Sequence, residues 1–126
     1  MATILVADDE RAIRLLLEMI LSDGGHRVLL AADGRQALER SERDRPDLVI
    51  ADVMMPVLDG AALCRQLKAG VMTARLPVIL MSAAAESAAR AAGADAFLRK
   101  PFDVAEVESL VQRLLPTRST EEVAGS

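Results

Sequence analysis

The sequence predicts an α/β domain whose core is a parallel sheet with helices on both faces. Five short apolar runs alternate along the chain with five stretches of helical pattern. Strict alternation of this kind is typical of parallel strands joined by right-handed crossover helices. The runs are almost continuously apolar, as expected of strands that are buried on both faces. The length of 126 residues suits one domain.

The first two strand–helix units occupy the start of the chain. Thr3–Ala7 reads TILVA and is the first predicted strand. Glu10–Ser22 is predicted to be a helix because its apolar residues recur on one stripe, and Asp23 with the two glycines after it ends that helix. Arg27–Ala31 is the second strand. A polar helix over Arg35–Arg43 follows, and the next proline ends it.

The third and fourth units follow the same pattern. Asp47–Ala51 reads DLVIA and is the third strand. A loop leads from it to a helix that Asp59 caps and that runs to about Ala69. Val78–Met81 is the fourth strand, opened by a proline. The helix after it, Ala84–Ala92, is rich in alanine and ends at a glycine.

The fifth unit closes the predicted domain. Ala96–Arg99 is the last strand, and Val104–Leu115 is a helix with its apolar residues at helical spacing. Pro116 ends that helix. We therefore assign residues 1–116 to one domain. Residues 117–126 are small, polar or charged, and are predicted to form a disordered tail or linker.

Composition excludes several classes of function. The net charge is −4, which argues against direct binding of nucleic acid because such binding depends mainly on basic side chains. Cys64 is the only cysteine, so we expect no internal disulfide and no zinc site. No apolar run approaches the about 18 residues of a membrane-spanning helix, and the N-terminus lacks the basic region of a signal peptide. We expect a cytoplasmic protein with no membrane contact.

Polar residues follow four of the five predicted strands. Asp8 and Asp9 come after the first strand, Asp52 after the third, Ser82 after the fourth and Lys100 after the fifth. Ligands of open α/β sheets bind beyond the carboxyl ends of the strands. Carboxylates that lie close together repel one another unless a cation intervenes. Mg²⁺ prefers oxygen ligands and phosphates, and a lysine and a hydroxyl suit phosphoryl oxygens.

The combination predicts a phosphoryl-transfer site in which an aspartate is the nucleophile. Each residue alone has a simpler interpretation. Asp8 or Asp9 is most simply the cap of the first helix. Asp52 resembles an ordinary turn residue, Ser82 a helix cap, and Lys100 with its proline a turn. Their joint occurrence at the ends of four strands favours the functional interpretation.

Four motifs, taken in order, resemble the receiver domain of two-component response regulators. They read ILVADDE at 4–10, DLVIADVMMPVLDG at 47–60, VILMSA at 78–83 and GADAFLRKPF at 93–102. The resemblance covers about residues 3–115. It implies a flavodoxin-like, doubly wound sheet of five parallel strands in the order 2-1-3-4-5. The stretch between the fourth and fifth strands is about one turn shorter than in similar domains, which implies a shortened helix 4.

The resemblance also implies roles for the acidic residues. Asp52 would accept a phosphoryl group from a phosphohistidine of a sensor histidine kinase or phosphotransfer protein. Asp9 would bind Mg²⁺ directly and Asp8 mostly through water, while Asp52 and the backbone carbonyl of Met54 would complete the metal site. Such a domain catalyses only its own phosphorylation and a slow self-dephosphorylation, and is not otherwise an enzyme.

Further roles concern the phosphoryl oxygens and the switch. Ser82 and Lys100 would contact the phosphoryl oxygens, and the bond from Lys100 to Pro101 is expected to be cis. Ser82 and Phe97 would switch the surface of helix 4, strand 5 and helix 5, although Phe97 also fits plain core packing. An unknown output protein or domain would respond. The shortened helix 4 favours a monomer or a weak, phosphorylation-dependent dimer.

Three other functions remain as alternatives. A metal-dependent phosphatase with an aspartate nucleophile usually needs a second Asp two residues later, and Met54 stands there. A flavodoxin-like cofactor binder needs a phosphate-binding loop after the first strand, where this chain has Asp8, Asp9 and Glu10. A scaffold without phosphorylation would not need the complete acidic set. Met54 and Ala84 cannot orient an attacking water, so we predict slow to moderate self-dephosphorylation.

Overall fold

A five-stranded parallel sheet forms the centre of the protein. The computed structural model describes residues 2–84 and 86–115. The strands lie side by side in the order β2-β1-β3-β4-β5, and each neighbouring pair is parallel. Their bounds are β1 Thr3–Ala7, β2 Arg27–Ala31, β3 Leu48–Asp52, β4 Val78–Ser82 and β5 Ala96–Arg99. The predicted fold class and strand order are confirmed, with β3 shifted by one residue and β4 extended to Ser82.

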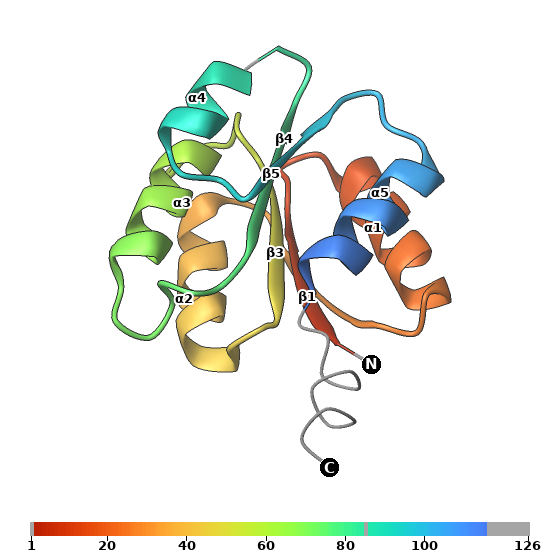
Figure 1. The fold of residues 1–126 in the computed structure, drawn as a ribbon, viewed down its shortest axis with the longest axis horizontal. Coiled ribbons are helices and arrows are strands. Elements are labelled where there is room, and N and C mark those ends of the chain that lie inside the picture. The colour runs from red at the N-terminus through yellow and green to blue at the C-terminus, as the bar shows by residue number, and fades with distance from the viewer. Residues whose placement is uncertain (1, 85, 116–126) are drawn as a thin grey trace.

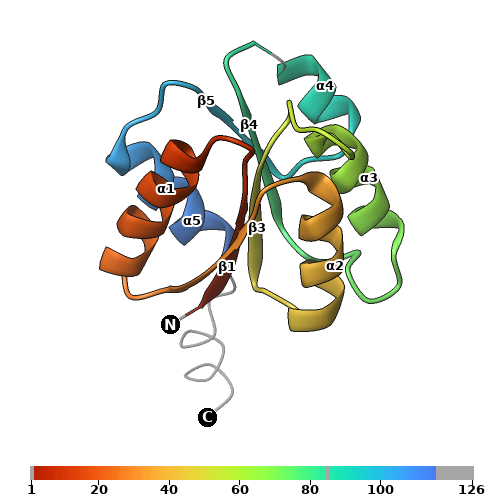
Figure 2. The same cartoon turned by 180° about the vertical axis from the view of Figure 1, so that it is seen from behind.

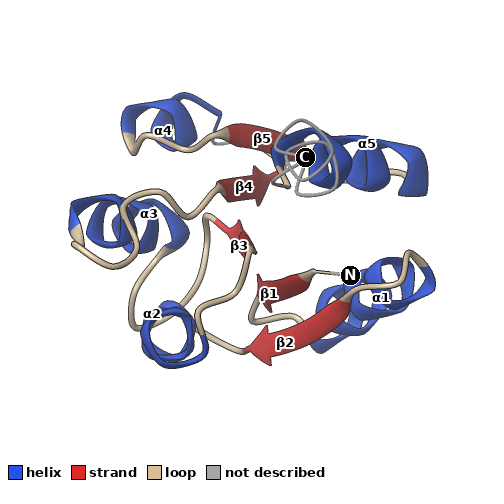
Figure 3. Ribbon diagram, turned by 60° about the horizontal axis from the view of Figure 1, so that its bottom comes forward, coloured by secondary structure: helices blue, strands red, loops and turns tan. Residues whose placement is uncertain are grey.

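Five helices cover the two faces of the sheet. Their bounds are α1 Arg11–Asp23, α2 Gly34–Asp44, α3 Gly60–Ala69, α4 Glu86–Ala91 and α5 Val104–Leu114. Figures 1 and 2 show α2, α3 and α4 on one face and α1 and α5 on the other, and Figure 3 shows the strands between these two layers. Helix α4 has six residues, so the expectation of a shortened fourth helix is confirmed. The predicted tail at 117–126 lies outside the described residues.

The core consists of two apolar layers, one on each face of the sheet. Successive strand residues point to opposite faces, and β1 shows this directly. Ile4 and Val6 pack against α1 and α5, whereas Leu5 and Ala7 pack toward α2, α3 and α4. All four are fully buried. This arrangement explains the continuous apolar runs. Cys64 is one of the buried residues on the face covered by α2, α3 and α4.

Aspartates cap three helices, but the expected cap of α1 is wrong. Asp33, Asp59 and Asp103 each accept a hydrogen bond from a backbone N–H in the first turn of the following helix. At α1 the cap position is Glu10, and its side chain makes no capping hydrogen bond. Asp8 instead accepts a hydrogen bond from the backbone N–H of Glu10 through Oδ1, at 2.8 Å. Its carboxylate is thereby kept at the end of the sheet.

One buried polar group of the fold lacks a partner. Ser41 of α2 is fully buried, and its hydroxyl has no hydrogen-bond partner among the described residues. We expect Ser41→Ala to raise the free energy of unfolding by about 1 kcal/mol, because burial of an unpaired hydroxyl is costly. Urea unfolding measures this. The control is Ser109→Ala on the exposed face of α5, in which the free energy of unfolding changes only through helix propensity. An equal increase in the free energy of unfolding in both variants would contradict the prediction.

Candidate functional site

The carboxyl ends of three strands bring Asp8, Asp52 and Lys100 together. Asp8 follows β1, Asp52 is the last residue of β3, and Lys100 follows β5. The Nζ atom of Lys100 lies 2.8 Å from Oδ2 of Asp8 and 2.9 Å from Oδ2 of Asp52. Asp8 is fully buried and Asp52 is 5% exposed. The sequence places these residues 92 and 48 positions from Lys100, so the fold alone creates the contact.

The second oxygen of each carboxylate is held by the backbone. Oδ1 of Asp52 accepts a hydrogen bond from the N–H of Met54 at 3.2 Å. Oδ1 of Asp8 accepts one from the N–H of Glu10. Each buried carboxylate therefore has one oxygen on a backbone amide and one on the ammonium group of Lys100. This arrangement fixes the orientation of both groups toward the same point.

Burial and ion pairing act in opposite directions on the pKa values. Burial raises the pKa of Asp8 above its ordinary value, and the hydrogen bonds from Lys100 and from the backbone of Glu10 offset only part of this. Burial alone would lower the pKa of Lys100, but the hydrogen bonds to Asp8 and Asp52 outweigh it, so the pKa is raised. Lys100 thus stays charged at neutral pH. One cation faces two carboxylates, which leaves the site with excess negative charge.

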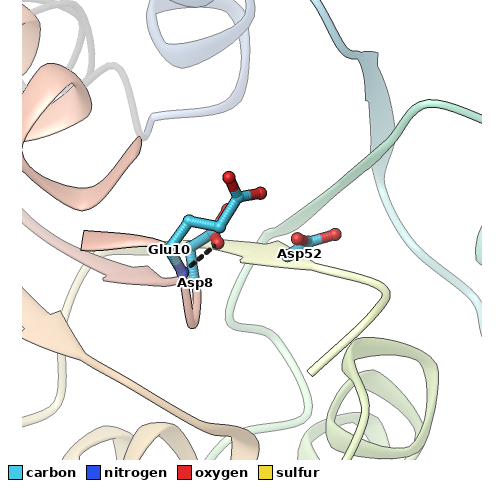
Figure 4. Close-up of side chains that lie close together, drawn as sticks. All are labelled: Asp8, Glu10 and Asp52. Carbon is cyan, nitrogen blue, oxygen red and sulfur yellow. Dashed lines mark hydrogen bonds between the residues drawn. The ribbon is translucent and has the colours of Figure 1, made fainter. Parts of the chain in front are cut away.

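A third carboxylate completes an acidic group that could hold a metal ion. One oxygen each of Asp8, Glu10 and Asp52 lie within 4.8 Å of one another, and Figure 4 shows these three side chains at the ends of β1 and β3. Nζ of Lys100 also lies 3.8 Å from Oε1 of Glu10. An all-oxygen set with excess negative charge fits a hard cation such as Mg²⁺. We call Asp8, Glu10 and Asp52 the acidic group.

Sequence reasoning predicted Asp9 as a ligand and did not name Glu10, which the structure adds to the acidic group. Asp9 is exposed and is not part of the acidic group of the described residues. Glu10 has extended backbone, with φ −88° and ψ 115°. The chain bends at Asp9, and beyond that bend a carboxylate oxygen of Glu10 lies within 4.8 Å of one oxygen each of Asp8 and Asp52. The third acidic residue in the run 8–10 was the signal that could have identified it.

The remaining predicted residues surround this site. Ser82 is 6% exposed at the end of β4, and its Oγ accepts a hydrogen bond from the N–H of Ala84 at 3.2 Å. Phe97 of β5 is half-buried, packs against the core beneath α2–α4, and lines two surface hollows of about 420 and 410 Å³. The side chain of Met54 is 70% exposed. The peptide bond between Lys100 and Pro101 is cis.

The loop between β3 and α3 has an uncommon backbone. Val57 adopts a φ of +71°, in the left-handed region that a β-branched residue rarely enters. The N–H of Leu58 donates to the carbonyl of Pro56 at 2.8 Å, which closes a three-residue turn around Val57. Strained backbone of this kind is concentrated at functional sites. Here it lies five residues after Asp52, and the side chain of Val57 is exposed.

Comparison with known proteins decides the family. The family model described as "Response regulator receiver domain" matches residues 4–112. The chain belongs to this family. It is a receiver domain of two-component systems, a signalling domain and not an enzyme in the usual sense. The geometry agrees, because Asp8, Asp52, Ser82 and Lys100 each come from a different one of the four motifs and lie at the carboxyl ends of neighbouring strands.

Individual relatives extend this assignment. Response regulator MprA of Mycolicibacterium vanbaalenii is 43% identical over 126 residues, which is 97% of this chain and 54% of that protein. The probable transcriptional regulator ycf27 of Cyanophora paradoxa is 40% identical over 131 residues, again 97% of this chain and 54% of that protein. The receiver domain therefore spans about half the length of the curated relatives it matches.

Solved structures of similar domains share the fold. The chemotaxis response regulator CheY4 of Vibrio cholerae is 32% identical with a TM-score of 0.86, covering 91% of this chain and 99% of that one. The receiver domain of sensor histidine kinase PA1611 from Pseudomonas aeruginosa is 36% identical with a TM-score of 0.84, covering 90% and 96%. That structure has a magnesium ion coordinated in its active-site cleft. Among the described residues of this receiver domain, no helix has the length and apolar character needed to cross a membrane.

Proposed function

We propose that Asp52 accepts a phosphoryl group from a phosphohistidine of a sensor histidine kinase or phosphotransfer protein. The observation that carries this proposal is the contact of Lys100 with both Asp8 and Asp52 at the carboxyl end of the sheet. This contact combines a buried carboxylate that can act as the nucleophile with an ammonium group. The ammonium group can form a hydrogen bond with a phosphoryl oxygen once Asp52 is phosphorylated. The magnesium-bound receiver domain of PA1611 supports the same assignment by analogy.

The metal site follows from the acidic group. Asp8, Glu10 and Asp52 offer oxygens close enough for one cation, and the carbonyl of Met54 stands two residues after Asp52. Asp9 remains a predicted direct ligand, as the resemblance to receiver domains implies. Mg²⁺ bound here would neutralise charge on the transferred phosphoryl group. Its arrival would also relieve the excess negative charge that Lys100 alone leaves.

The chain's own residues then perform the transfer. A carboxylate oxygen of Asp52 forms a bond to phosphorus while the bond from phosphorus to the histidine nitrogen breaks, and the electron pair returns to the imidazole. Lys100 shifts from the Asp52 oxygen to a phosphoryl oxygen, and the hydroxyl of Ser82 donates to another. The protein mainly positions and neutralises, because the transition state spreads charge over the phosphoryl oxygens.

Phosphorylation is proposed to change the surface formed by α4, β5 and α5. Movement of Ser82 toward the phosphoryl group would pull the loop after β4, and Phe97 would turn into the space that is released. The guanidinium of Arg99 donates to the carbonyl of Ala83 at 3.0 Å, so the same loop is attached to β5. The receiver domain is proposed to control an output domain or protein, acting as a monomer or weak dimer.

Phosphorylation by a small donor tests this function. The protein is incubated with Mg²⁺ and acetyl phosphate, and its intact mass is measured, with Asp52→Asn as the matched control. We expect one added phosphoryl group in the wild type, none in the variant, and none when Mg²⁺ is chelated. Because Met54 and Ala84 cannot orient water, the adduct should be lost slowly. An adduct that persists in Asp52→Asn would contradict the assignment, and a half-life of seconds would contradict the slow loss.

A second measurement covers the case in which acetyl phosphate is a poor donor. Beryllofluoride mimics a phosphoryl group on an aspartate and needs no donor. Amide NMR spectra are recorded during its titration in the presence of Mg²⁺. We expect shifts in the residues around Asp52 and Ser82 and in β5. An unchanged spectrum, together with no mass adduct, would support the scaffold alternative and overturn the proposal.

A further inference from the structure

Arg14 is the basic residue of α1 that contacts the acidic loop. Its Nη1 atom donates to the backbone carbonyl of Asp8 at 2.7 Å, and the side chain is half-buried. Its backbone N–H also donates to the carbonyl of Glu10 at 3.1 Å. Arg14 therefore joins the first turn of α1 to the loop that carries two of the three residues of the acidic group.

The hydrogen bond from Arg14 adds a fourth contact to the three other hydrogen bonds that hold Asp8 in place. The N–H of Asp8 donates to the carbonyl of Ala31 in β2 at 3.2 Å. Its carbonyl accepts from Arg14, one carboxylate oxygen accepts from the backbone of Glu10, and the other accepts from Lys100. Every polar group of Asp8 thus has a partner, and among the residues that the structure describes Arg14 is the one that donates to its carbonyl.

Among the described residues, Arg14 is the only side chain of α1 that donates a hydrogen bond to the preceding loop; the backbone N–H of Glu10 adds a bond to the carboxylate of Asp8. The cap residue of α1, Glu10, makes no side-chain capping hydrogen bond, unlike Asp33, Asp59 and Asp103 at α2, α3 and α5. At α1 the guanidinium of Arg14 instead connects the first turn of the helix to the preceding loop, through its hydrogen bond to the carbonyl of Asp8. A charged donor on a carbonyl is stronger than a neutral pair, and Arg keeps its charge at all relevant pH values.

We propose that Arg14 is a positioning residue for divalent-cation binding by the acidic group. It holds the main chain of the 8–10 loop so that the oxygens of Asp8 and Glu10 converge with that of Asp52. This inference rests on the proposed function, since it concerns the same cation. Arg14 does not ligate the ion and does not touch the phosphoryl group.

Charge and position make opposite predictions for this residue. A guanidinium near the acidic group weakens the attraction of a cation by simple electrostatics. Its removal should therefore tighten Mg²⁺ binding if charge dominates. If positioning dominates, the removal loosens the loop and weakens Mg²⁺ binding. The two effects differ in sign, so one measurement distinguishes them.

The test compares Mg²⁺ affinity in Arg14→Met, Arg14→Lys and wild type. The chain contains no Trp or Tyr, so Mg²⁺ titrations are followed by amide NMR at residues 8–10 or by calorimetry. We expect Arg14→Met to weaken Mg²⁺ binding about tenfold, the effect of losing a charge-assisted hydrogen bond. Arg14→Lys keeps one donor and should recover part of that loss. The matched control is Arg11→Met, which removes the same charge from the same turn at an exposed position.

Each outcome has a defined meaning. Weaker binding in Arg14→Met, with Arg11→Met unchanged and Arg14→Lys intermediate, supports the proposal. Tighter or equal binding in a folded Arg14→Met overturns it, while the proposed function stands because the wild type still binds. If Arg14→Met fails to fold, the Mg²⁺ affinity of folded Arg14→Lys is compared with that of wild type instead. Weaker binding then supports the proposal, and equal or tighter binding overturns it. Absence of Mg²⁺ binding in the wild type would instead overturn the metal part of the proposed function.

Discussion

Replacing Lys100 with methionine is expected to lower the free energy of unfolding by about 3–5 kcal/mol in the absence of divalent cations. Its ammonium group is the cation shared by Asp8 and Asp52, which are almost completely buried. Removing one partner from a buried ion pair leaves uncompensated charge in a poorly solvated place. Methionine keeps the length of the side chain, so the loss reports the charge. Urea unfolding of wild type and variant in chelator measures it.

The same variant should respond strongly to pH. Loss of the Lys100 hydrogen bond removes a contribution that lowers the pKa of Asp8, so this pKa rises further. A carboxyl with a raised pKa binds protons more readily in the folded than in the unfolded state. On acidification from neutral pH toward that pKa, the folded variant takes up more protons than the unfolded variant. The difference in free energy of unfolding between wild type and variant should therefore become smaller. A variant that loses stability faster than wild type on mild acidification would contradict this.

Saturating Mg²⁺ should restore much of the lost stability. A cation that binds only the folded state stabilises it by mass action, and it replaces the missing ammonium between the carboxylates. Lys68→Met is the matched control, because Lys68 forms an ion pair with Asp95 at 2.6 Å away from the acidic group. It should destabilise the protein without any additional response to Mg²⁺. If Mg²⁺ raised the free energy of unfolding equally in Lys100→Met and Lys68→Met, the idea that Mg²⁺ replaces the ammonium group of Lys100 would be contradicted.

The architecture was predictable because its signals are local. The continuous apolar runs and the helical stripes each depend on a few neighbouring residues, so the strands β1, β2 and β5 have the predicted bounds. The strand order came from the resemblance to receiver domains and not from periodicity. Strand β4 includes Ser82, which pairs with Arg99. Hydrophobicity alone ended that strand one residue too early.

Side-chain direction in short loops was less predictable. The run Asp8, Asp9 and Glu10 shows that carboxylates gather after β1, but it does not show which of them lie close to Asp52. The left-handed Val57 contradicts local preference, so no sequence rule would place it there. The buried Ser41 lies in a helix with a strongly polar sequence. In each case tertiary packing overrides a local tendency.

Replacing Gly60 with alanine is expected to displace Asp52, the proposed phosphoacceptor. A Cβ atom at Gly60 would overlap the backbone carbonyl oxygen of Asp52 and lie 2.8 Å from its carbonyl carbon and 2.9 Å from Cα of Val53. These are backbone atoms of the strand end, so no rotamer change relieves the overlap. Gly60 also donates its N–H to the carbonyl of Val53 at 2.9 Å. Either β3 or the start of α3 must move.

Both stability and phosphoryl transfer should suffer from that movement. Overpacking of this kind costs about 1–3 kcal/mol of unfolding free energy. A displacement of about 1 Å in a reacting group can slow a reaction about 100-fold, so phosphorylation by acetyl phosphate should slow by up to that factor. Intact-mass time courses measure the rate, and urea unfolding measures the stability.

Gly24→Ala provides the comparison that isolates the close approach. Gly24 follows α1 with a φ of −78°, and a Cβ there meets its nearest neighbours at 3.4 Å. That distance calls for only a small adjustment, so this variant should keep both stability and phosphorylation rate close to wild type. A folded Gly60→Ala that is phosphorylated as fast as Gly24→Ala would contradict the argument. Gly60 would then be needed for the turn into α3 and not for the position of Asp52.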